Sequence, residues 1–193
     1  MVSDLEAAKT IYEQFFETNF DPEAFAEERS VERDACNTEN VAKWRAWQRA
    51  SLDETIALSD AALEQRPSAI AWMFPTGGRS HADPDAPVIG RRVLRATAVD
   101  DPELPPALLQ SFNRVVRHLG LVERDGSLLW RAAPQAWAAM PQRDWRVYRM
   151  LRCVHNAGLA TQTAMLLKFL DRELGGNPTQ ADALAWYYHQ VAS

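Results

Sequence analysis

The chain has 193 residues, 47% hydrophobic and 24% charged, which suits a folded protein with one sizeable core. No run of about 18 apolar residues occurs, so the sequence predicts no membrane-spanning helix. Two cysteines, Cys36 and Cys153, do not make a disulfide framework, which indicates either a reducing compartment or simply no need for bridges. The first residues are acidic and amphipathic, unlike a signal peptide, so we expect a cytoplasmic protein.

The net charge of −5 is unevenly distributed along the chain. Residues 1–64 carry 15 acidic and 6 basic side chains, whereas residues 65–193 carry 11 and 15. This asymmetry favours ion pairs between the two parts of the fold. The alternative is a basic surface for an anionic partner.

Four helices are predicted in the first third of the chain, over residues 4–18, 22–29, 41–50 and 51–65. The last of them begins at a capping box, with Ser51 as the cap and Glu54 three residues later. Trp44 and Trp47 are expected to point inward from the third helix.

The stretch from Arg66 to Val88 is the predicted centre of the fold. A short helix over 68–74 ends at Pro75 and places Ile70, Met73 and Phe74 on one face, with Trp72 beside it. Because this segment carries much apolar area, we expect it inside, held by two strongly patterned helices of the second half.

The second half predicts further helices over residues 106–119, 132–140, 144–157 and 161–174, and one starting at Pro178. Residues 91–98 fit either a short helix or irregular structure. Asp125-Gly126 lies between two apolar runs, the usual sign of a tight β-hairpin. The fold class is therefore mainly α: a single-domain bundle of about seven to nine helices with one small hairpin. Residues 1–60 are interpreted as an N-terminal helical extension packed on a core of residues 61–193.

The clearest polar feature is a series of arginines at a spacing of three, predicted to form a ribbon along one helix. Its members are Arg143, Arg146, Arg149 and Arg152. Such a ribbon suits phosphate or a carboxylate-bearing peptide, with Trp72 and His81 as further ligand-binding candidates. A solvated face, or ion pairs with the acidic first third, is the simpler interpretation. Nucleic-acid binding is disfavoured because the chain is not strongly basic overall.

A second candidate is the loop containing His81, Asp83 and Asp85. Alternating ligands in an extended segment can reach one metal ion, although further ligands are needed from elsewhere. A solvated turn is the simpler reading, so no metal, cofactor or catalytic residue is assigned. Motifs for nucleophilic catalysis and phosphate-binding loops are missing from the sequence.

Several short sequence segments of the chain occur in the same order as similar segments of a known family. They are Ala71–Thr76, His81-Ala82, Ala86–Val88, Ser111–Arg114, Leu119–Leu121, Trp130–Ala132, Arg146–Arg152, Gly158-Leu159 and Ala181–Tyr187. Across residues 60–190 the chain resembles the conserved domain of the opioid growth factor receptor, and within that family a bacterial member. The chain has Arg143-Asp144-Trp145 where the family usually carries a His-Asn pair before the arginine helix. The resemblance implies a helical domain. Opioid-peptide binding is ascribed to eukaryotic members, with no residue set that transfers to this chain.

The hypothesis favoured by these observations is a non-catalytic helical module that binds a peptide or protein partner, and the arginines suit an acidic one. The alternatives are a metal-dependent enzyme using His81, Asp83 and Asp85, and a weak nucleic-acid binder acting through the arginine ribbon.

Overall fold

The computed structural model describes residues 38–80, 82–131 and 143–174. Within them the chain forms seven helices and one two-stranded antiparallel hairpin, which confirms the predicted mainly α fold. The elements are α3 (Thr38–Ala57), α4 (Asp60–Glu64), α5 (Pro67–Met73), α6 (Arg91–Asp100), α7 (Leu104–His118), β1 (Leu121–Arg124), β2 (Ser127–Trp130), α9 (Arg143–Asn156) and α10 (Ala160–Leu174). The predicted helices at 4–18, 22–29, 132–140 and after Pro178 lie outside the described residues.

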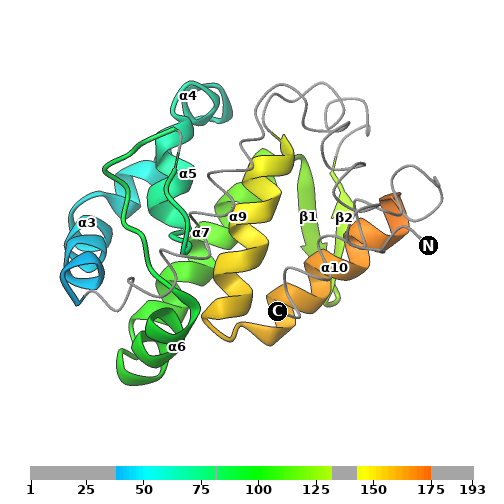
Figure 1. The fold of residues 1–193 in the computed structure, drawn as a ribbon. Helices are drawn as coiled ribbons and strands as arrows, with labels where there is room; N and C mark the ends of the chain where they lie inside the picture. The colour runs from blue at the N-terminus through cyan, green and yellow to red at the C-terminus, as the bar shows by residue number, and fades with distance from the viewer. Residues whose placement is uncertain (1–37, 81, 132–142, 175–193) are drawn as a thin grey trace, which may run out of the picture.

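Helix α9 occupies the middle of the described part, with α10 and the hairpin on one side and α5 and α3 toward the other (Figure 1). Helix α7 contacts α3, α6, α9 and β1, so it joins the two sides. Every one of these helices and strands contributes a buried side chain to a single apolar cluster. Burial of apolar area around α9 and α7 is therefore what holds the elements together.

Helix α5 is central, as the sequence predicts, but its tryptophan lies differently. Pro67 takes the first turn, where a missing backbone N–H costs nothing, and Phe74 follows the last residue. Ile70, Met73 and Phe74 are fully buried. Trp72 is only half-buried and packs against Trp47 of α3, which corrects the expectation that it lies inside between the later helices.

Helix α3 is continuous through Ser51, so the predicted capping box there is wrong. Thr55 Oγ1 instead donates to the carbonyl oxygen of Ser51 within the helix, at 2.7 Å. The real cap is Ser59, whose Oγ accepts from the N–H of Ala62 at the start of α4. The break between α3 and α4 is held by Arg114 of α7, whose guanidinium donates to the carbonyl oxygens of Ile56 and Leu58.

The loop that follows α5 folds back onto α3. Thr76 and Val88 form an isolated parallel bridge, and the N–H of Ile89 donates to the carbonyl oxygen of Thr76 at 2.9 Å. Asn40 of α3 donates to the carbonyl oxygen of Val88, and Lys43 of α3 donates to that of Asp85, both in the second half of this loop. These contacts hold the two ends of the loop together and fix the loop on α3, just before the chain enters α6.

The predicted hairpin is confirmed, with Leu121 opposite Trp130 and Arg124 opposite Ser127. Asp125 and Gly126 both have positive φ, +52° and +70°, as a two-residue type I′ turn requires. Strand β2 then packs on α10.

Helices α9 and α10 meet at a tight corner. Gly158 takes a positive φ of +81°, its N–H donates to His155 and the N–H of Leu159 donates to Val154. This is the Schellman arrangement that ends many helices, and it closes the helix that was predicted over residues 144–157. The apolar stripes of both helices are buried as expected, for example Val147 and Leu166.

Residues 38–57 contribute directly to the core, since Trp44 and Leu52 of α3 are buried against α5 and α7. The proposed boundary at residue 60 stays a prediction. In the described residues no helix is both long enough and apolar enough to cross a bilayer.

Candidate functional site

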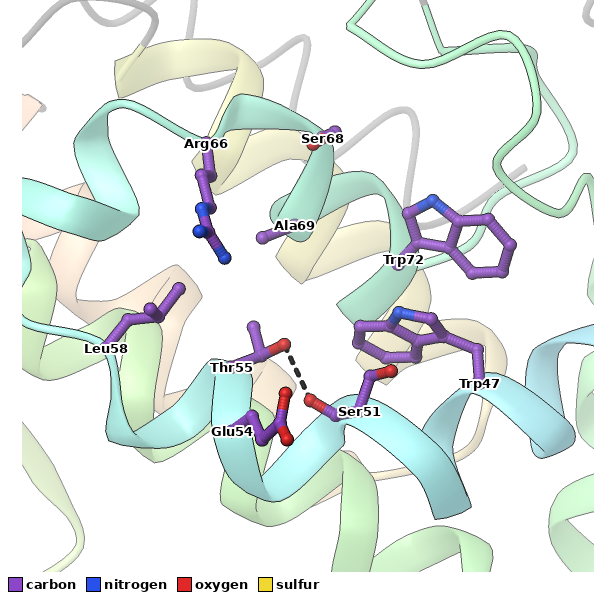
Figure 2. A pocket seen from close by; sticks show the side chains of 9 residues that line it. All are labelled: Trp47, Ser51, Glu54, Thr55, Leu58, Arg66, Ser68, Ala69 and Trp72. Atoms are coloured by element: carbon purple, nitrogen blue, oxygen red, sulfur yellow. Dashed lines mark hydrogen bonds between the residues drawn. The ribbon is translucent and has the colours of Figure 1, made fainter.

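A groove of about 340 Å³ lies between α3 and α5, and Arg66 from the segment before α5 also lines it (Figure 2). We call it the α3–α5 groove. Its lining residues are Trp47, Ser51, Glu54, Thr55, Leu58, Arg66, Ser68, Ala69 and Trp72. The volume falls at the lower end of the range for ligand pockets, about 300–1,000 Å³, so it suits one or two side chains or a small molecule.

One end of the groove is a pair of tryptophans. The rings of Trp47 and Trp72 lie with centroids 5.6 Å apart and planes tilted by 31°. Trp72 is fixed from three directions: its Nε1 donates to Asp83 Oδ2 at 2.7 Å, its carbonyl oxygen accepts from Trp44, and the Lys43 ammonium lies 5.5 Å from its ring centroid. An aromatic surface held in this way loses little freedom when a ligand packs on it.

The other residues of the groove are mostly polar and include two charges of opposite sign. Figure 2 shows Arg66 reaching into the groove from the segment before α5 and Glu54 from α3 below it. Within the described residues neither side chain makes a hydrogen bond or an ion pair. Ser51 and Ser68 add hydroxyl groups to the same lining. The groove therefore offers an aromatic surface, one cation and one anion to the same bound molecule.

Sequence reasoning missed this groove. It assigned Glu54 to a capping box and Trp47 to the core, and it gave Arg66 no role. The available signal was the i, i+4 and i+8 spacing of Trp47, Ser51 and Thr55, which aligns aromatic and hydroxyl side chains on one face of a helix. The partner wall could not be read from that spacing, because α5 returns to α3 only through tertiary packing.

The arginine ribbon is placed mainly inside the fold. Arg146 and Arg149 are buried, with exposed fractions of 1% and 3%. Arg149 Nε donates to the carbonyl oxygen of Phe74 at 3.2 Å, which ties α9 to the end of α5. Arg152 is half-buried, and the side chain of Arg143 lies outside the described residues.

Arg146 sits in a cluster of charged groups from α4, α7 and α9. Its guanidinium donates to both carboxylate oxygens of Glu64, at 2.5 and 2.9 Å, and also lies 3.0 Å from His118 Nε2. His118 Nε2 also lies 3.2 Å from Glu64 Oε2, and His118 Nδ1 lies 3.7 Å from Asp60 Oδ1, so the imidazole is surrounded by one guanidinium and two carboxylates. Hydrogen bonding from Arg146 lowers the pKa of Glu64. Burial, followed by the charge of Arg146, lowers the pKa of His118 below 6.5, so the imidazole is neutral at pH 7.

This neutral histidine predicts a pH dependence of stability. The unfolded chain binds a proton at His118 near pH 6.5, whereas the folded chain binds it only at lower pH. The contribution to stability is therefore complete above about pH 6.5 and decreases as the pH falls toward the folded pKa, by at most about 1.4 kcal/mol per pH unit. Urea unfolding at pH 7.5, 6.5 and 5.5 measures this decrease.

The variant His118→Gln keeps an acceptor for Arg146 but cannot titrate, so its stability should change less over the same range. His155 serves as the comparison, because burial and then Arg91, Arg152 and Arg95 also lower its pKa. His155→Gln should remove a separate part of the dependence. An unchanged profile in both variants would contradict the assignment.

The proposed metal ligands are only partly visible. His81 lies outside the described residues. Asp83 accepts from Trp72 through one oxygen and from the N–H of Asp85 through the other, as in an Asx turn. In the described ranges no three or more His, Cys, Asp or Glu side chains are grouped so as to hold a metal ion. The His81, Asp83 and Asp85 set stays a prediction.

The fold and the groove together define a mainly helical domain with an open, tryptophan-lined pocket of mixed charge. Comparison with known proteins found no matching family model, no similar curated protein and no similar solved structure.

Proposed function

We propose that this protein is a non-catalytic binding module that holds a short peptide segment of a partner in the α3–α5 groove. The observation that carries the proposal is a fixed tryptophan surface beside two side chains of opposite charge, Arg66 and Glu54, which have no partner among the described residues. Preorganised aromatic groups are the usual anchors of interfaces, and a charged pair beside them sets orientation.

The lining indicates which peptide fits. An apolar or aromatic side chain would pack on Trp47 and Trp72, and a neighbouring carboxylate would pair with the fork of Arg66. Glu54 would accept backbone N–H groups or a basic side chain on the opposite wall. An extended peptide presents all three groups within a few residues, which agrees with the sequence-based expectation of an acidic partner.

The groove takes the ligand-binding role that the sequence suggested for the arginine ribbon. Charge reversal at Arg146 or Arg149 would bury a carboxylate beside groups arranged for a guanidinium, so such variants would report on folding rather than on binding. Membership in the opioid growth factor receptor domain family and a cytoplasmic location remain part of the proposal. They rest on the sequence blocks and the composition given above.

An array of defined peptides tests the proposal. We expect peptides with an aromatic residue next to Asp or Glu to bind, and their Asn or Gln counterparts to bind less. Arg66→Glu should weaken this binding by about tenfold or more, since a charge-assisted hydrogen bond is lost. Trp47→Ala should weaken binding to the same peptides through lost aromatic contact.

The matched control is Arg79→Glu, which makes the same charge change at an exposed residue outside the groove. It should leave affinity within about twofold, because exposed charges contribute little. If Arg66→Glu and Arg79→Glu weakened peptide binding equally, the effect would come from the net charge of the protein and not from the groove. If neither Arg66→Glu nor Trp47→Ala changed peptide affinity, the peptide would not bind in the α3–α5 groove. Circular dichroism of each variant separates either result from misfolding.

A further inference from the structure

A second group of polar side chains, unrelated to the groove, lies where α6 meets α9. Arg91 and Arg95 are one turn apart on α6, and Arg152 and His155 are three residues apart on α9. Residues at these spacings share a helix face. The two helices contact each other, and Figure 1 shows α6 beside the end of α9 that leads into α10.

The side chain of Arg95 spans the junction. A Cβ built on Gly158 would come within 1.8 Å of Arg95 Nη1 and 2.5 Å of Arg95 Cζ, so the guanidinium lies directly against this glycine. Gly158 has a positive φ and ends α9, three residues after His155. The absence of a side chain at this corner is therefore what lets a cation of α6 reach the end of α9.

The two cations that α6 brings to this junction pair with no carboxylate among the described residues. Within the described residues Arg91 and Arg95 make no hydrogen bond and no ion pair. The charged groups that lower the pKa of His155, after burial itself, are all guanidinium groups: Arg91, Arg152 and Arg95. In the described ranges His155 Nε2 is buried and has no hydrogen-bond partner. Water screens much of the repulsion between the exposed Arg91 and Arg95, but a group of like charges still attracts an anion.

The start of α6 adds donors of a different kind. The helix is ten residues long and begins at Arg91, with Gly90 as its cap and no side chain to satisfy the first N–H groups. These N–H groups and the positive end of the helix dipole attract anions. A positive side chain such as Arg91 is unfavourable at the positive end of a helix dipole. The free N–H groups and the charge of Arg91 therefore both favour a bound anion. The negative end of α9 can account for one cation, Arg95, but not for Arg91.

We propose that the junction of α6 and α9, formed by Arg91, Arg95 and His155, is a binding site for a phosphate group. Guanidinium forks match the oxygens of phosphate in a bidentate way, and a dianion compensates more of the clustered charge than a carboxylate does. The phosphate is either inorganic phosphate or the terminal group of a small phosphate monoester. The site shares no residue with the α3–α5 groove, so phosphate binding here and peptide binding there can be tested independently.

Proton NMR of the histidine Cε1–H signal tests the site directly. We expect inorganic phosphate or phenyl phosphate to shift the signal of His155 and to raise its pKa, because a bound anion favours the protonated ring. Acetate at the same ionic strength should shift it less. The signal is assigned with His155→Gln, and fixed salt removes general screening. Tighter binding of phenyl phosphate would indicate a monoester, and tighter binding of phosphate would indicate the free ion.

The decisive variant is Arg91→Gln/Arg95→Gln, which should weaken phosphate binding by about tenfold or more. The matched control is Arg92→Gln/Arg117→Gln, which removes the same charge from exposed positions of α6 and α7. It should leave the affinity within about twofold. Because Arg91 and Arg95 are exposed, both double variants should fold. Equal affinity in the two double variants, or no response of His155 at millimolar phosphate, would overturn the proposal.

Discussion

Replacing Arg146 with alanine is expected to lower the free energy of unfolding by about 3 kcal/mol or more. The side chain is 1% exposed and joins α9 to Glu64 of α4 and His118 of α7. Its removal leaves a carboxylate and an imidazole without their donor, and it empties the space of a long buried stem. Glu64 is one-third exposed, so water compensates part of the loss at that end. Urea unfolding at pH 7.5 measures the change.

Arg117→Ala is the control for this variant, since it removes the same charge from an exposed position of α7. It should change the free energy of unfolding by less than about 0.5 kcal/mol. The double variant Arg146→Met/Glu64→Leu should recover part of the loss, because apolar side chains replace an unpaired charge. If Arg146→Ala were as stable as Arg117→Ala, the guanidinium would not hold α4, α7 and α9 together.

Replacing Phe74 with alanine is expected to lower the free energy of unfolding by about 3–5 kcal/mol. Phe74 is fully buried and lies at the end of α5, where its carbonyl oxygen accepts from Arg149 of α9. Loss of the ring opens a cavity at the place where α5 meets α9, and helices fixed by other contacts cannot close it fully. Thermal and urea unfolding both measure the effect.

Two further variants distinguish the cavity from a general sensitivity of the chain. Phe74→Leu keeps most of the apolar volume and should cost less than about 1.5 kcal/mol. Val99→Ala deletes methyl groups from a side chain that is 75% exposed and should be nearly neutral. A loss at Phe74→Ala no larger than at Phe74→Leu would show that the core can repack around α5, contrary to its central position.

The elements that the sequence predicted well are those whose signals are local. The hairpin follows from Asp125 and Gly126, because only a few residues accept the positive φ of a type I′ turn. The end of α9 follows from Gly158 for the same reason. The apolar stripe that includes Val147 and Leu151 is buried as its period indicates.

The predicted capping box at Ser51 and Glu54 is wrong because the local motif there does not interrupt the longer helix α3. Both residues have good positions for a cap, but α3 continues through them, and the break comes instead at Ser59. The carbonyl groups freed at that break are satisfied by Arg114, which is 56 residues away from Leu58 along the chain. No sequence window contains both partners, so the true boundary depends on tertiary structure.

The sequence by itself determined a mainly helical chain, its turns and most of its buried stripes, because periodicity and glycine chemistry act within a few residues. Tertiary structure decided which polar residues are internal and which are available. Arg146 and Arg66 look alike in the sequence, yet Arg146 is buried against Glu64, whereas Arg66 faces an open groove and has no partner in the part of the chain that the structure describes. The physical reason is that a charge becomes structural or functional through the groups that packing places beside it.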